Sequence, residues 1–288
     1  MIDRGAPGCR ARLIVNVDDF GLTRGINAET VRCIEEGVAT SVSLMPCGFA
    51  FDEARMLASR YAHRVGVGVH LALDGPPPVS AADDVGTLID GNGRFFPRAQ
   101  IIARLLAGRS LRSQVQREWA AQIEKVLDAG LPIDHLDGHG HLHVLPPLAG
   151  IVADLAEKYG IRAVRMPWDR FSGGRPYKRL PGRMVLRASA RYARSRFGDR
   201  LHFADSMIGF SCGGSYSERC FLRDVERIRE GETVEAMFHP GPRQIDHPDL
   251  DAWVGYRWEV DSATLRSARV RDRLAELGIQ LIKYGDIS

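Results

Sequence analysis

The sequence predicts an α/β protein built on a parallel sheet of about seven strands. Short runs of apolar and β-branched residues alternate with longer helical patterns, and strands and helices follow one another in β-then-α order. That order favours parallel pairing with right-handed crossovers. No glycine-rich phosphate loop follows the first strand, which disfavours a dinucleotide-binding sheet. A closed or nearly closed barrel and an open doubly wound sheet both fit.

Each expected strand is a short, mostly apolar run, and the first, "RLIVNV", is typical of a buried strand. In chain order, the expected strands are Arg12–Val17, Thr40–Met45, Val65–Leu71, Pro132–Asp137, Ile161–Pro167, Val234–His239 and Ile279–Tyr284. The expected helices lie near Asn27–Glu36, Phe51–Tyr61, Leu111–Ala129, Leu148–Tyr159, Ser217–Arg229 and Ser262–Leu277. No repeat, low-complexity tract or interdomain linker interrupts this order, so residues 1–288 are expected to form one domain.

The composition is that of an ordinary globular protein, with 44% hydrophobic and 26% charged residues. No apolar run approaches the roughly 18 residues that a membrane span needs. The N-terminal stretch "MIDRGAPGCRAR" has no apolar segment that could act as a signal peptide, so a cytoplasmic protein is expected. The five cysteines are scattered without a CxxC pair, which favours idle thiols over disulfides or a zinc knuckle.

Positive charge is concentrated in one inserted segment, about residues 168–215. The net charge is +3, but residues 170–200 hold ten Lys and Arg against one acid, Asp199, so the rest of the chain is acidic. No nucleic-acid partner is expected from this distribution. Arginines recur there at helical spacing beside an apolar stripe. The arginines are Arg183, Arg187, Arg191 and Arg194, and the stripe is Leu186, Ala190, Ala193 and Phe197.

Two interpretations are open for residues 183–197. They form either a solvated surface helix or an amphipathic helix that rests on an anionic membrane, which would make the protein membrane-peripheral. The sequence also leaves open whether the chain forms a homodimer.

A run of histidines, "HLDGHGHLHVLPP", places His139, His141 and His143 at every second position. In an extended chain, at roughly 3.3 Å per residue, the first and third histidines lie about 13 Å apart, too far to share one ion. The run can therefore supply one ligand, or two, to a metal.

Other polar side chains stand at the expected strand ends, where parallel α/β folds gather their catalytic groups. They are Asp18 and Asp19, His70, Asp137 and His139, Arg165, and His239. Each has a plainer interpretation, since Asp can cap a helix, a single His can be a core residue, and another can order a turn. Five strand ends with such groups favour a functional site.

The motifs "NVDDFG", "TSVSLM", "GVHL", "HLDGHGHLHVLP" and "FHPG" resemble, in order and spacing, those of the YdjC family of carbohydrate deacetylases. That family includes chitooligosaccharide deacetylases and hopanoid-associated deacetylases. The resemblance extends from about Leu13 to Asp286. It implies a (β/α)-barrel-like fold, not necessarily closed, and a divalent-metal-dependent hydrolase that removes acetyl from an N-acetylated sugar.

Roles for individual residues follow from the resemblance. It implies Asp19, His70 and His139 as metal ligands, Asp18 as the general base and His239 as the acid. Arg165 either orients Asp18 or is a surface ion-pair residue. Three further residues, Asp137, His141 and His143, are candidates for contacts behind the metal ligands or with the sugar.

Two departures from the family bear on the substrate. Other members often carry a histidine where this chain has Gly140, and residues 168–215 resemble the hopanoid-associated members more than the compact ones. An oligosaccharide and a glycolipid-linked amino sugar are both open as substrates. Two imidazoles and one carboxylate suit zinc, whereas the resemblance also allows magnesium.

Two alternative functions remain open. One is another mononuclear metal hydrolase, such as a phosphoesterase, and the lack of a second acidic cluster disfavours it. The other is a non-catalytic sugar- or lipid-binding protein, which would need neither a base nor an acid.

Overall fold

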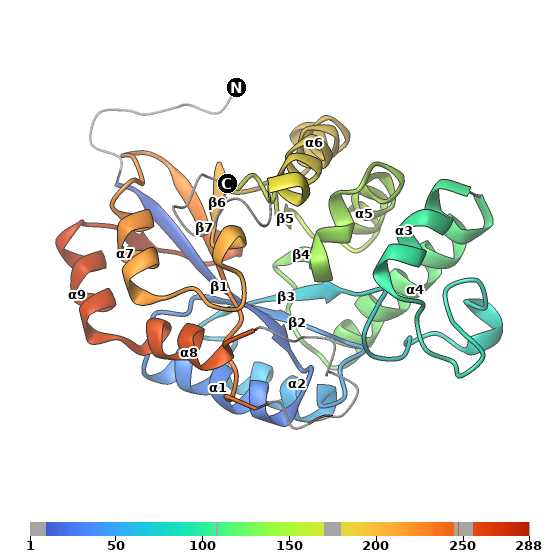
Figure 1. Cartoon of the computed structure of the whole chain (residues 1–288), viewed down its shortest axis with the longest axis horizontal. Coiled ribbons are helices and arrows are strands. Elements are labelled where there is room, and N and C mark those ends of the chain that lie inside the picture. The colour runs from blue at the N-terminus through green and yellow to red at the C-terminus, as the bar shows by residue number, and fades with distance from the viewer. Residues whose placement is uncertain (1–9, 108, 170–179, 245–246, 248–255, 288) are drawn as a thin grey trace.

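The computed structural model describes residues 10–287, except for residues 108, 170–179, 245–246 and 248–255. A curved sheet of eight parallel strands forms the centre of this part of the chain (Figure 1). Its order is β5 (Ala163–Val164), β4 (His135–Gly138), β3 (Gly66–Leu71), β2 (Ser41–Leu44), β1 (Arg12–Phe20), β7 (Thr233–Phe238) and β6 (Ser206–Ile208). The last strand, β8 (Gln280–Leu281), pairs with the first two residues of β1.

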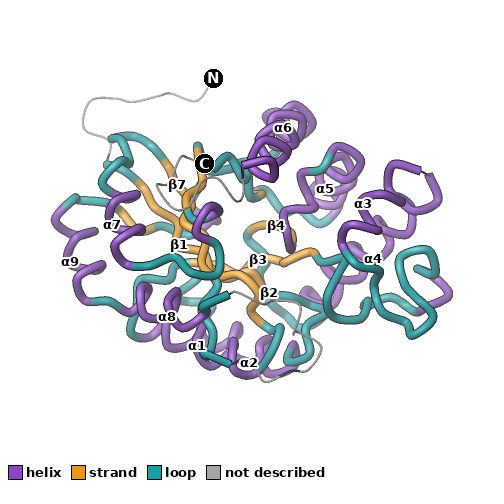
Figure 2. Tube along the Cα trace, viewed as in Figure 1, coloured by secondary structure: helices purple, strands orange, loops and turns teal. Residues whose placement is uncertain are grey.

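Helices surround the outer face of this sheet (Figure 2). They are α1 (Arg24–Glu35), α2 (Phe51–Tyr61), α3 (Arg98–Ala107), α4 (Arg109–Asp128), α5 (Pro146–Lys158), α6 (Leu180–Phe197), α7 (Glu218–Val225), α8 (Trp258–Arg266) and α9 (Ala268–Glu276). The sheet curls into an open half-barrel, which confirms the predicted barrel-like α/β fold. In the described part of the chain, the isolated bridges Ala163–His202 and Asp169–Met207 lie between the two edges.

Local sequence explains where these elements begin and how closely they pack. Thr23 caps α1, because its hydroxyl accepts the N–H of Ile26, and prolines open α5, where the missing N–H costs nothing. Strand β3 contains Gly68 because the ring of His135 on β4 lies against it. A Cβ at residue 68 would come within 2.2 Å of that ring.

Several elements differ from those the sequence predicts. Strand β6 lies in the basic insertion and was not expected, since three residues held by pairing with β7 carry no readable pattern. Helix α3 was also missed. The expected helix Ser262–Leu277 is two helices, because Ser267 is extended and its hydroxyl accepts the N–H of Val270, which starts α9. The expected strand Ile279–Tyr284 shortens to two residues.

The predicted amphipathic segment is helix α6, which packs against α5. Its apolar stripe, Leu186, Ala190, Ala193 and Phe197, is buried in the protein. Arg187 and Arg194 lie over the rings of Trp168 and Phe203, while the side chain of Arg183 is outside the described part of the structure. The stripe therefore faces the body of the protein, which agrees with the interpretation as a surface helix. Among the described residues, no helix is long and apolar enough to cross a bilayer.

Candidate metal centre and active site

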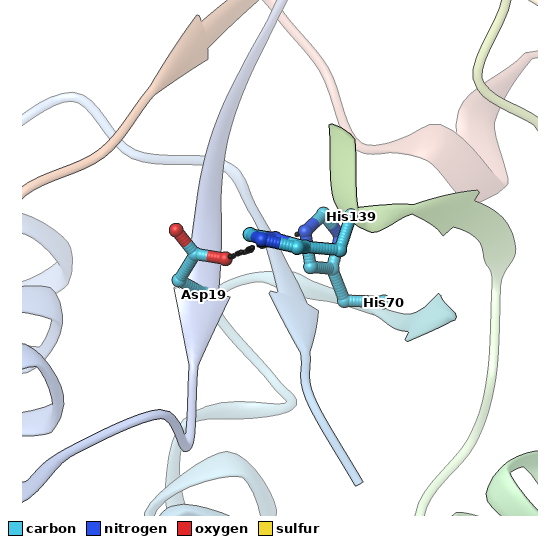
Figure 3. A group of neighbouring side chains, drawn as sticks. All are labelled: Asp19, His70 and His139. Carbon is cyan, nitrogen blue, oxygen red and sulfur yellow. Dashed lines mark hydrogen bonds and ion pairs between the residues drawn. The ribbon is translucent and has the colours of Figure 1, made fainter. Parts of the chain in front are cut away.

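The polar side chains at the carboxyl ends of the strands meet at one end of the half-barrel. Asp18 and Asp19 come from the end of β1 and His70 from β3, while His139 follows β4 and His239 follows β7. Each of these side chains belongs to a buried residue. Figure 3 shows Asp19 facing His139, with His70 beside them.

Asp19, His70 and His139 have the donor set and the spacing of a metal site. One ligand atom from each lies within 4.8 Å of the other two. Asp19 Oδ1 is 3.1 Å from His139 Nδ1 and 3.4 Å from His70 Nε2. Bonds of about 2.0–2.1 Å to a tetrahedral zinc place neighbouring ligand atoms about 3.3 Å apart. Asp19 Oδ2 is buried without a hydrogen-bond partner among the described residues, as expected for a carboxylate oxygen that can bind a cation.

The conformation of Asp19 directs both aspartates toward the same centre. Neighbours on an extended strand point to opposite sides. Asp19 instead has a φ of 62°, in the left-handed region, and the pairing of β1 with β2 shifts register between Val17 and Phe20. This irregularity breaks the alternation, so carboxylate oxygens of both aspartates approach His70.

His70 is oriented from behind by Asp137. Its Nδ1 lies 2.9 Å from Asp137 Oδ1, which leaves Nε2 directed at Asp19. Burial alone would lower the pKa of His70, but Asp137, Asp19 and Asp18 together raise it to about 10. The pKa of Asp19 is held well below its usual range, because His139 and His70 outweigh its burial. The centre therefore favours a positive charge, either a proton or a metal ion.

Arg165 is fully buried and joins three carboxylates. Its guanidinium binds both oxygens of Asp18 at 2.8 and 2.6 Å, Asp137 at 2.7 Å and Glu235 at 2.8 Å. The alternative of a surface ion pair is therefore wrong. Asp18, His70 and Asp137 form a second group with metal-like spacing, but Arg165 already supplies its positive charge. The Asp19 group is the one left to hold a metal.

His239 lies beside Asp18 at the same end of the barrel. Its Nε2 is 3.7 Å from Asp18 Oδ2, and its backbone N–H donates to Asp261 Oδ2 at 2.9 Å. Burial lowers the pKa of His239, although Asp18 and Asp19 oppose that shift. The rings of Tyr256 and Trp258 stand nearly perpendicular to the imidazole, at 5.7 and 6.3 Å.

The histidine run is a 3-10 turn, His139–Val144, and the expected extended geometry is wrong. Gly140 and His141 have φ values of 58° and 60°, which reverse the chain directly after His139. His143 Nε2 is instead 3.0 Å from the carbonyl oxygen of Arg165, and the ring of His141 lies 5.6 Å from that of Phe210. Among these three histidines, only His139 joins the candidate metal group.

Burial keeps the other two histidines neutral. It lowers the pKa of His143 to about 4 and that of His141 well below its usual range. His143 and Asp137 are fully buried and hydrogen-bonded within the protein, which disfavours direct contact of either side chain with a sugar. His141 keeps 7% of its surface exposed and remains a candidate for contact with a substrate.

Sequence reasoning missed several polar residues inside the barrel. Glu235 accepts from Arg165 and from the hydroxyl of Tyr284. Asn16 donates to Asp18 at 2.8 Å, and Ser43 donates to Asp137 at 2.8 Å. A period of two would have found some of them, because Asn16 precedes Asp18 by two residues and Glu235 precedes His239 by four, on the same strand face.

Comparisons with known proteins agree with this geometry. The family model described as YdjC-like protein matches residues 12–276. A carbohydrate deacetylase of Brevibacillus brevis is 31% identical over 280 residues, covering 96% of this chain and 99% of the relative. A human carbohydrate deacetylase is also 31% identical, over 300 residues, with coverages of 96% and 91%.

Among solved structures, similarity extends over the whole fold. One is a protein of Enterococcus faecalis V583, described as a proposed cellobiose-phosphate cleavage protein. It superimposes on this chain with a TM-score of 0.77. It is 25% identical in sequence, and the match covers 96% of this chain and 98% of that one.

Proposed function

The chain belongs to the YdjC-like protein family, and we propose that it is a metal-dependent hydrolase that removes the acetyl group from an N-acetylated amino sugar. The relatives named carbohydrate deacetylases, which align over nearly the whole chain, support deacetylation of a carbohydrate. The observation that carries the proposal is the buried group of Asp19, His70 and His139 directly beside Asp18 and His239. The substrate is an oligosaccharide or a glycolipid-linked amino sugar.

Three residues would hold the ion: Asp19 through its carboxylate, His139 through Nδ1 and His70 through Nε2. When bound there, a divalent ion would supply a Lewis acid for the acetyl carbonyl and would lower the pKa of a bound water. Two nitrogen donors and one carboxylate favour zinc over magnesium, which prefers oxygen ligands. Asp137 would keep His70 in the tautomer that directs Nε2 to the ion, the contact behind a metal ligand that was one of the two alternatives for it.

Asp18 is the proposed general base. Amide hydrolysis adds water to the carbonyl carbon, so one water proton must leave, and the Asp18 carboxylate accepts it. Arg165 binds both oxygens of Asp18 and so fixes the orientation of the carboxylate. It acts through Asp18 and is therefore a positioning residue.

His239 is the proposed acid. When the carbon–nitrogen bond breaks, the amine leaves with the bonding electron pair and needs a proton. His239 Nε2 is 3.7 Å from Asp18 Oδ2, so a bridging water or substrate group would carry the proton taken by Asp18 to His239, which then protonates the nitrogen. The lowered pKa of His239 makes its imidazolium a stronger acid, which gives up its proton more readily. The products are acetate and a free amino sugar.

The experiment that tests the function is acetate release from a panel of N-acetylated oligosaccharides and glycolipids. Zinc-loaded protein should release one acetate for each new amine from at least one substrate, and Asp18→Asn should release none at the same metal content. The same preparations are assayed on phosphomonoesters. Phosphate release without acetate would support a phosphoesterase, and sugar binding without either product would support a non-catalytic binding protein.

A further inference from the structure

The imidazole of His239 is not held in place by hydrogen bonds of its own. Its Nδ1 is buried without a hydrogen-bond partner among the described residues. Its Nε2 is 3.7 Å from Asp18, beyond the length of a hydrogen bond. His239 also follows the last residue of β7, so the sheet does not fix its main chain. Something else must hold the acid beside the base.

That anchor is the carboxylate of Asp261, in the first turn of α8. Asp261 Oδ2 accepts the backbone N–H of His239 at 2.9 Å, and its Oδ1 accepts the N–H of Tyr216 at 2.6 Å. One carboxylate thus ties together the segments that follow β7 and β6. Thr264, one turn later, donates to the carbonyl of Tyr216 at 2.9 Å and not to His239.

The burial of the Asp261 carboxylate costs more free energy than a purely structural contact requires. It is fully buried, and no cation among the described residues pairs with it, since its hydrogen bonds come from two backbone N–H groups. Burying a carboxylate without a cation is costly, and burial raises the pKa of Asp261 to about 7. A neutral side chain could accept the same N–H groups at lower cost.

We propose that Asp261 is a positioning residue for the acid His239: it fixes the main chain of His239 so that Nε2 stays beside Asp18. This inference rests on the proposed deacetylase function. Asp261 acts through the backbone, because its carboxylate binds the N–H of His239 and not the imidazole.

The test compares two substrates that differ in their need for an acid. An N-acetylated sugar has an amine leaving group that must be protonated, whereas 4-nitrophenyl acetate releases a phenolate that leaves unprotonated. Asp261→Asn keeps one acceptor oxygen but turns an NH₂ group toward a donor. It should lower kcat on the amide by roughly tenfold to a hundredfold, leave KM and zinc content unchanged, and spare the ester.

A double-mutant cycle shows whether the effect passes through His239. In a His239→Ala background, Asp261→Asn should cause no further loss on the amide, because the acid it positions is gone. Thr264→Ala is the matched control, since it removes one buried bond from the same helix to Tyr216. It should leave the amide-to-ester rate ratio unchanged. If Asp261→Asn does not fold, Asp261→Glu moves the same carboxylate by one methylene and should show the same split.

Equal losses on amide and ester, or additive losses in the cycle, would overturn the positioning role. So would an unchanged amide rate in a folded Asp261→Asn protein. An unmodified protein that hydrolyses no N-acetylated sugar would instead count against the proposed function. The two failures are therefore distinguishable.

Discussion

At the scale of single residues, the two neighbouring aspartates have different partners, so substituting each should impair a different property of the enzyme. Asp18 is bound by Arg165, and Asp19 contacts His139 and His70. Asp18→Asn keeps size and polarity but cannot accept a proton. It should keep the metal and the substrate affinity and lose at least roughly a hundredfold in turnover. Asp19→Asn should lose metal first, and added zinc should partly restore its rate.

Metal analysis and acetate release on both variants check this assignment. Arg165 and Asp18 together form a buried pair, so thermal melts must show that each variant is folded before its rate is compared. If Asp18→Asn loses the ion while Asp19→Asn keeps it, the roles of the two aspartates are exchanged.

The pKa of His70 predicts how metal affinity depends on pH. Without metal, the surrounding carboxylates raise this pKa to about 10, so near neutral pH the imidazole carries a proton that a metal ion must displace. Below about pH 10, the apparent zinc affinity should rise about tenfold per pH unit. Competition titrations against a chelator from pH 6 to 8 measure this slope. A flat affinity over that range would contradict a His70 that is protonated in the metal-free protein and loses its proton to zinc.

The residues of the candidate site differ in how readable they are from sequence. Asp18, Asp19, His70 and His239 stand in short motifs at strand ends, where both position and chemistry are visible. Asp261 could not be found this way, because its contacts with His239 and Tyr216 join residues 22 and 45 positions away. The local sequence pattern of a helix does not indicate contacts with residues so distant in the chain.

At the scale of elements, glycine relieves backbone strain at position 140 of the turn His139–Val144. The φ of Gly140 is 58°, and a Cβ there would lie 2.3 Å from the guanidinium of Arg98. The guanidinium is the far end of a partly exposed side chain and can move away. The cost of Gly140→Ala should therefore come mainly from the strain of the left-handed backbone. Gly140→Ala should cost about 1–2 kcal/mol in the free energy of unfolding and weaken zinc binding through His139.

Urea denaturation compares this variant with Gly182→Ala. Gly182 is exposed in α6, and a Cβ there meets nothing within 4 Å, so that variant should be neutral or slightly stabilising. Adding Arg98→Ala to Gly140→Ala should recover little. Full recovery would mean that the contact with Arg98, and not the left-handed backbone, requires the glycine.

Helix α6 offers a second test at this scale. Leu186 is 7% exposed within the stripe that packs into the protein, while Met184 on the same helix is 67% exposed. Leu186→Ala should cost about 2–4 kcal/mol in unfolding free energy, and Met184→Ala should change it by less than about 0.5 kcal/mol. Urea denaturation measures both. A neutral Leu186→Ala would mean that the stripe is free to face another surface, such as a membrane.

Elements with long, repeated patterns were predicted well, and short ones were not. The strand Arg12–Val17 corresponds to most of β1, and the expected helix Phe51–Tyr61 is α2 with the same bounds. Strand β6 has three residues and depends on its pairing with β7, and the break at Ser267 depends on one side-chain bond. Such features arise from contacts made only after folding.

At the scale of the whole molecule, the half-barrel concentrates charge at one end. Four buried acids lie at this end, Asp18, Asp19, Asp137 and Glu235. The buried guanidinium of Arg165 binds three of them, and Asp19 contacts His70 and His139 instead. The acids outnumber the cations, so a divalent ion that displaces the proton of His70 adds positive charge here and should stabilise the folded protein. The resemblance predicted the barrel, but the balance of charge inside it emerged only from the folded arrangement.

We propose that one bound metal ion makes this chain a carbohydrate deacetylase. The most direct measurement titrates chelator-treated protein with zinc while recording acetate release from the best N-acetylated substrate. The rate should be negligible without metal, rise linearly with zinc and reach a plateau at one ion per chain. Acetate release that is undiminished in metal-free protein, or a plateau at two ions per chain, would contradict the single site of Asp19, His70 and His139.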